Sequence, residues 1–85
     1  MEVPSWPSGR VKLEGDVLEF GAGELARVPV ANLTNVEVKP PRKGRFNLRI
    51  EYTAGLSNNK TGAWVEEPHE AELTELAASI KAAMG

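Results

Sequence analysis

The sequence predicts a small α+β domain that is mainly β-strand and ends in one α-helix. Short segments in which apolar and polar residues alternate, as in half-buried strands, follow one another from Arg10 to Glu67. Glycine, asparagine and proline lie between these segments, where turns are expected. After Pro68 the apolar residues change to the spacing of one helical face.

Composition limits the classes of protein that the chain can belong to. A chain of 85 residues is one domain, and 41% hydrophobic with 26% charged residues is ordinary for a globular protein. The net charge of -2 argues against a generally basic nucleic-acid binder, so we expect no nucleic-acid partner. Without cysteine there is no disulfide, thiolate metal site or cysteine nucleophile.

The apolar runs are too short for a membrane span, which needs about 20 residues, so no transmembrane segment is predicted. The first residues also lack the basic and apolar pattern of a signal peptide, and we therefore expect a cytoplasmic protein.

The chain divides into an irregular N-terminal arm at residues 1–9 and the domain at residues 10–85. Pro4 and Pro7 predict the arm because each removes a backbone donor. The strands "RVKLE" and "VLEF" follow, with a hairpin turn at Gly15-Asp16. Further strands are predicted at "LARVPV", "ANLTNVEVK", "RFNLRIEYT" and "AWVEE", with loops at residues 40–44 and 54–62.

The predicted core combines the inward face of the strands with one face of the helix. In "RFNLRIEY" every second residue is apolar, which makes this segment the clearest strand of the chain. In the helix the apolar residues follow i, i+3, i+4 spacing. The predicted core residues are Val36, Val38, Phe46, Leu48, Ile50, Tyr52, Trp64, Leu73, Leu76 and Ile80.

A basic segment at residues 39–45 is the strongest candidate for a binding site. The candidate anion-binding residues are Lys39, Arg42, Lys43, Arg45 and Arg49. Near an anionic membrane, four cations would contribute roughly 4 kcal/mol, which corresponds to about millimolar affinity. The alternative interpretation is a solvated loop whose charges protect a sheet edge.

Signals for catalysis are weak. "GAGELA" at residues 21–26 matches the pattern G-x-G-x-x-A, but a nucleotide site needs a helix there, and Pro29 favours a strand instead. His69 is the only histidine and has no second nitrogen or sulfur ligand nearby in the sequence. We therefore expect no enzyme, no metal site and no cofactor.

The order of the elements resembles the pleckstrin-homology-like (PH-like) fold, and in particular the short bacterial PH-like domains of uncharacterised function. The resemblance lies in "VKLEGDVLEF", "ARVPVANLTNVEVKPP" and "RFNLRIEYTAG". Val28-Pro29-Val30 is similar to an "I-P-L" type triplet, and Leu33-Thr34-Asn35-Val36 to an "I-x-x-V" type strand. "ELTELAASIKAAM" is similar to the closing helix of the family.

The resemblance implies a barrel of two packed antiparallel sheets with seven strands, closed by one C-terminal α-helix. Six strands are predicted above, so the seventh is expected around Leu56 to Thr61. Eukaryotic members often bind phosphoinositides through a basic loop between the first two strands. Here that turn is Gly15-Asp16 beside Glu14, so this lipid role is not carried over.

We therefore expect a non-enzymatic PH-like binding or assembly module that acts through protein-protein contacts, with self-association as one form of them. The first alternative is weak peripheral binding of anionic lipid or another polyanion through the basic loop 39–45. The second is a small β-barrel ligand carrier or enzyme that uses a concave face near Trp64 and Tyr52.

Overall fold

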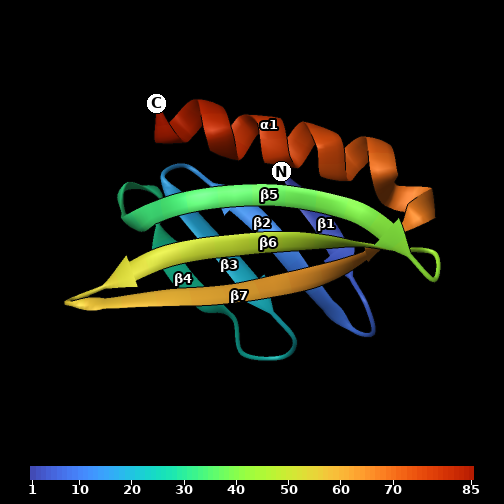
Figure 1. The fold of residues 1–85 in the computed structure, drawn as a ribbon, viewed down its shortest axis with the longest axis horizontal. Helices are drawn as coiled ribbons and strands as arrows, with labels where there is room; N and C mark the ends of the chain where they lie inside the picture. Colours follow the sequence, from blue (N-terminus) through green and yellow to red (C-terminus); the bar gives the residue numbers. More distant parts are fainter.

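Two antiparallel sheets and one α-helix make up the fold in the computed structural model, which describes residues 1–85 (Figure 1). The strands are β1 (Glu2–Ser5), β2 (Gly9–Glu14), β3 (Val17–Gly21), β4 (Ala26–Pro29), β5 (Leu33–Arg42), β6 (Arg45–Ala54) and β7 (Ser57–Glu66). Two short 3-10 helices, η1 (Val30–Asn32) and η2 (Glu67–His69), precede β5 and the helix α1 (Glu70–Met84).

The first sheet has the strand order β1-β2-β3-β4, and the second has the order β5-β6-β7. On one side, η1 connects β4 to β5. On the other side, the sheets meet at a single bridge, in which the backbone N–H of Trp6 donates to the carbonyl of Trp64 at 2.6 Å. The predicted two-sheet, mainly β architecture is confirmed, but the sheets do not close into a barrel.

The first predicted hairpin is also confirmed. Glu14 pairs with Val17 across the Gly15-Asp16 turn, and Gly15 has a φ of 60°. Two-residue hairpin turns need this left-handed conformation, which glycine adopts without a steric penalty.

The prediction of an irregular arm is wrong for Glu2–Ser5, which form β1 at the edge of the first sheet. Val3 pairs with Val11 and is fully buried. The N–H of Leu13 donates to the carbonyl of Met1, so the backbone N–H and C=O groups of the odd-numbered residues of β1 point toward β2. The backbone nitrogen of Pro4 therefore lies on the outer side of this edge strand, where no hydrogen bond to a neighbouring strand is lost.

The basic segment is a tight hairpin rather than a loop at residues 40–44. β5 extends to Arg42 and β6 begins at Arg45, so only Lys43 and Gly44 form the turn, with φ values of 53° and 76°. The strand pairing shifts between Lys39 and Arg42, which indicates a bulge over the two prolines. The prolines lie in a strand at a sheet edge, where their missing donors are accommodated.

The predicted loop at residues 54–62 is wrong over most of its length. Only Gly55 and Leu56 form a turn, and β7 begins at Ser57. Residues 57–62 therefore lengthen the last strand, and the strand missing from the sequence-based count is β1. The long β6 offers a complete pairing partner, which outweighs the low strand propensity of Asn58 and Asn59.

The core lies between the two sheets and under α1. Of the predicted core residues, seven are buried: Val36, Phe46, Leu48, Ile50, Leu73, Leu76 and Ile80. Val38 and Tyr52 are partly buried against them. Trp64 is 41% exposed, so its assignment to the core is wrong; its neighbour Val65 is fully buried, and successive strand residues face opposite sides. The first sheet adds Val3, Val11, Leu18, Phe20 and Val28.

The C-terminal helix is confirmed. It lies along β5, and it also contacts β1 (Figure 1). Leu73, Leu76, Ala77 and Ile80 form its buried face. α1 is neither long nor apolar enough to cross a membrane.

Candidate functional site

The candidate site lies on the outer face of the second sheet. In β6, Phe46, Leu48 and Ile50 face the core, which turns Arg45, Asn47 and Arg49 outward. The strand register places Lys39, Asn47 and Trp64 in one row across the sheet. The predicted basic residues of β5 and β6 and the unexpectedly exposed Trp64 therefore share one face.

The five predicted anion-binding residues line two adjoining hollows. Arg42, Lys43 and Arg45 surround a hollow of about 250 Å³ together with Trp6 and Trp64. Lys39, Arg42 and Arg49 line the second, of about 430 Å³, with Pro40, Asn47 and Trp64. We name the first group, Trp6, Arg42, Lys43, Arg45 and Trp64, the Trp–Arg surface.

Two exposed tryptophans form the apolar part of this surface. Trp6 is 44% exposed and Trp64 is 41% exposed, although each is anchored by the backbone bridge between them. The guanidinium carbon of Arg45 lies 3.8 Å from the centre of the Trp6 ring, which is a cation–π contact. The Nε of Arg45 is buried and has no hydrogen-bond partner.

The ion pairs divide the predicted cations into two groups. Lys39 Nζ lies 2.9 Å from a carboxylate oxygen of Glu37, and this hydrogen bond and charge lower the pKa of Glu37 below its ordinary value. Arg49 lies 3.9 Å from Glu51. Arg42, Lys43 and Arg45 make no ion pair. Their charges are therefore free to meet an anion.

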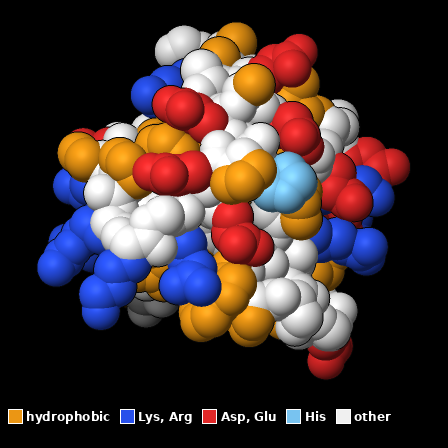
Figure 2. All heavy atoms as spheres, turned by 90° about the vertical axis from the view of Figure 1, so that its right-hand side faces the viewer, with side chains coloured by type: hydrophobic (Ala, Val, Ile, Leu, Met, Phe, Trp, Pro, Cys, Tyr) orange, Lys and Arg blue, Asp and Glu red, His pale blue; other side chains and the backbone are white.

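Acidic residues lie next to the basic group. Glu66 is opposite Arg45 in the strand register, and Glu67 donates its backbone N–H to the carbonyl of Gly44. Figure 2, which looks onto this end of the molecule, shows Lys and Arg side chains gathered at the lower left and acidic side chains around the histidine. The positive region is therefore local, with an acidic border.

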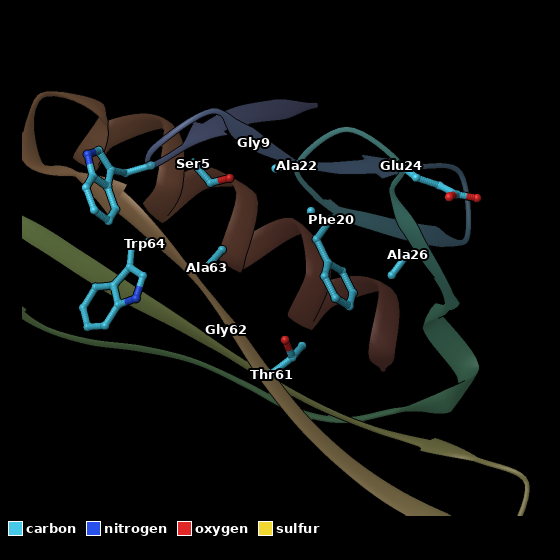
Figure 3. Close-up of a pocket in the computed structure, with 12 residues that line it drawn as sticks. Ser5, Gly9, Phe20, Ala22, Glu24, Ala26, Thr61, Gly62, Ala63 and Trp64 are labelled. Carbon is cyan, nitrogen blue, oxygen red and sulfur yellow. The ribbon is translucent and has the colours of Figure 1, made fainter.

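A third cavity, of about 380 Å³, lies in the seam between β7 and the first sheet (Figure 3). The ring of Phe20 points into it from β3, and Thr61 and Ala63 face it from β7. Trp64 lines this cavity too, whereas Tyr52 packs edge-on against Phe20 with 6.3 Å between ring centres. Of the two residues expected at a concave face, only Trp64 lies there.

The residues considered for catalysis are dispersed. β4, and not a helix, follows the "GAGELA" segment, as the sequence predicted. His69 makes one polar side-chain contact, with 3.2 Å between its Nδ1 and the carboxylate of Glu72. No three His, Cys, Asp or Glu side chains group as they would around a metal ion.

Sequence reasoning missed Trp6. Its contribution depends on the bridge to Trp64, 58 positions later, which local pattern does not reveal. The one available signal was a large aromatic residue in a polar, proline-flanked segment.

Comparisons of the chain with protein-family models, with curated proteins and with solved structures find no match. The class of protein that fold and site define is a small two-sheet domain with a C-terminal helix and an exposed aromatic and basic surface.

Proposed function

We propose that this protein is a non-enzymatic binding module of PH-like fold that docks an acidic partner protein on the Trp–Arg surface. The PH-like part is supported by two antiparallel sheets with seven strands in all, followed by one helix, as the resemblance implies. The open seam between the sheets is where this chain departs from a closed barrel.

The observation that carries the proposal is the combination of two exposed tryptophans with three cations that make no ion pair. Tryptophan and arginine are the residues most enriched among those that dominate binding energy at protein interfaces. Three cations that make no ion pair within the chain favour a partner with negative charge.

Lipid alone is a weaker explanation of the same surface. Three cations near an anionic membrane contribute roughly 3 kcal/mol, which is less than the roughly 4 kcal/mol of a millimolar complex. Leu56, the most exposed hydrophobic side chain, lies in the β6–β7 turn, at the opposite end of the molecule from the Lys43-Gly44 turn (Figure 1). A membrane that contacts the basic turn at one end of the molecule therefore could not also contact Leu56 at the other.

A random-peptide phage library provides a test without a known partner. Peptides that the protein enriches are expected to be acidic, and their binding is measured through the intrinsic fluorescence of Trp6 and Trp64, the only two tryptophans. Lys43→Glu is expected to weaken binding by about tenfold or more, because it reverses one charge in the surface. Lys81→Glu makes the same change on the exposed face of α1 and is expected to have no effect.

Three outcomes contradict the proposal. Enriched peptides without acidic preference, or equal losses for both variants, would remove the Trp–Arg surface as the docking site. Salt-sensitive binding to phosphatidylserine vesicles, together with no enriched peptide, would favour the anionic-lipid alternative instead.

A further inference from the structure

β7 presents an unpaired strand edge. It is the last strand of the second sheet, and its one backbone hydrogen bond on the free side is accepted by Trp64 from Trp6. Within a strand, the N–H and C=O of one residue point to the same side, and those of the next residue point to the other. Counting back from Trp64, the free groups on this edge belong to Gly62, Lys60 and Asn58.

An apolar cavity runs beside this edge. The two sheets separate beyond the Trp6–Trp64 bridge, and the space between them is the seam cavity of about 380 Å³. Phe20 and Ala26 line it from the first sheet, opposite Ala63 (Figure 3). Its volume lies within the roughly 300 to 1,000 Å³ typical of ligand pockets.

Edge and cavity together match one kind of ligand. A free backbone N–H and C=O at every second residue is the pattern that an additional β-strand pairs with. Every second side chain of such a strand points to the same face, so one set would enter the cavity while the other lies on the outer face of the sheet. The absence of a side chain at Gly62 does not bear on this edge, because a side chain there would meet Asn47 and the Leu48 carbonyl of the neighbouring β6.

The charges on the two faces specify the ligand further. On the outer face, Lys60 and Arg49 make only long contacts, of 3.8 and 3.9 Å, with Glu51. An acidic side chain of the ligand would be favoured there. Phe20, Ala26 and Ala63 line the cavity, so the side chains that enter it are expected to be apolar, and Glu24 at the rim disfavours acidic ones.

We propose that β7 accepts an extended segment of a partner protein as an additional strand. The segment pairs with Asn58, Lys60 and Gly62, places apolar side chains against Phe20 and Ala63, and presents acidic side chains to Lys60 and Arg49. This site goes beyond the Trp–Arg surface, because it requires neither Arg42 nor Lys43.

The test uses peptides selected from the random library by the full-length Lys43→Glu variant, so that the Trp–Arg surface does not dominate selection. Amide hydrogen exchange is then measured by NMR with and without peptide. We expect the amides of Asn58, Lys60 and Gly62 to exchange rapidly in the free protein and to become protected in the complex. The amides of Asn59, Thr61 and Ala63, which pair with β6, are expected to be protected in both.

Backbone changes on both sides of the complex separate strand pairing from other contacts. Lys60→Pro removes one edge N–H and should weaken peptide binding about three- to tenfold more than Lys60→Ala, which removes only the charge. If the Lys60→Pro variant does not fold, N-methylation of the peptide still distinguishes strand pairing from other contacts. Methyl groups on alternate peptide amides should reduce binding about tenfold, and those on the intervening amides should not.

Several results would overturn the inference. They are the absence of any enriched peptide, protection that does not include Asn58, Lys60 and Gly62, and equal effects of N-methylation at all positions. Protection of the same three amides that rises with protein concentration and without peptide would show that a second copy of the chain occupies the edge. Peptides bound only at Trp6 and Trp64 would leave the proposed function intact while removing this site.

Discussion

At the scale of single residues, the Arg45–Trp6 contact joins a cation and an aromatic ring of the Trp–Arg surface. Arg45 is the first residue of β6 and Trp6 directly follows β1, so their stacking links the two sheets beside the backbone bridge. Cation–π contacts at partly exposed sites contribute about 0.5 to 1 kcal/mol.

We predict a coupling free energy of that size, about 0.5 to 1 kcal/mol, between Arg45→Ala and Trp6→Ala. It is obtained from a double-mutant cycle of urea unfolding. Additive effects of the two substitutions would show that the stacking contributes nothing to stability.

The Glu37–Lys39 pair gives a pH-dependent prediction at the same scale. The hydrogen bond and charge of Lys39 lower the pKa of Glu37, so the pair stabilises the folded state above the ordinary pKa of a glutamate. This contribution is lost as the pH falls through the lowered pKa, and it is small because both side chains are exposed. In an NMR titration, Lys39→Ala should return the pKa of Glu37 toward its ordinary value. An unchanged midpoint would contradict the pairing.

At the scale of elements, α1 supplies a large part of the core. Leu73, Leu76 and Ile80 are essentially fully buried. Burial of such side chains contributes roughly 1.5 to 3 kcal/mol each, which together is comparable with the net stability of a small domain.

We therefore predict that a chain ending at Glu67 has no cooperative thermal transition. In the full-length protein, Leu76→Ala should lower the free energy of unfolding by about 2 to 5 kcal/mol, because it leaves a cavity in the core. The neighbouring Glu75→Ala, on the exposed face, should change it by less than about 0.5 kcal/mol. Cooperative unfolding of the truncated chain would refute the packed-helix interpretation.

At the scale of the whole molecule, groups of opposite charge lie side by side at one end (Figure 2). The net charge is only -2, but Arg42, Lys43 and Arg45 lie at the β5–β6 turn, and acidic residues lie from the end of β7 to the first turn of α1, namely Glu66, Glu67, Glu70 and Glu72. An acidic partner would thus be attracted at one side of this end and repelled at the other.

We predict that the association rate of an acidic peptide with the protein falls with added salt, because salt screens long-range attraction. In stopped-flow fluorescence, Lys43→Glu should remove most of this salt dependence, and Lys81→Glu should retain it. A rate independent of salt in the unmodified protein would contradict a charge-guided approach.

Local pattern predicted those parts of the fold that depend on nearby residues. The alternation in "RFNLRIEY" and the helical spacing after Pro68 identify their buried faces, because side-chain direction repeats every two residues in a strand and about every 3.6 in a helix. The same reasoning located the cations of the candidate site and the Gly15-Asp16 turn.

Pairing between segments distant in the sequence determined the other parts of the fold. Where local composition favoured a turn or loop but a neighbouring strand was available, the strand formed. Val3 pairs with Val11 despite Pro4, and Asn59 pairs with Tyr52 despite its turn propensity, because an adjacent strand satisfies their backbone groups. The contact between Trp6 and Trp64, the free edge of β7 and the seam beside it also exist only once the sheets have packed. Binding on this protein is therefore proposed where distant segments meet, since no single segment contains both the aromatic and the basic parts.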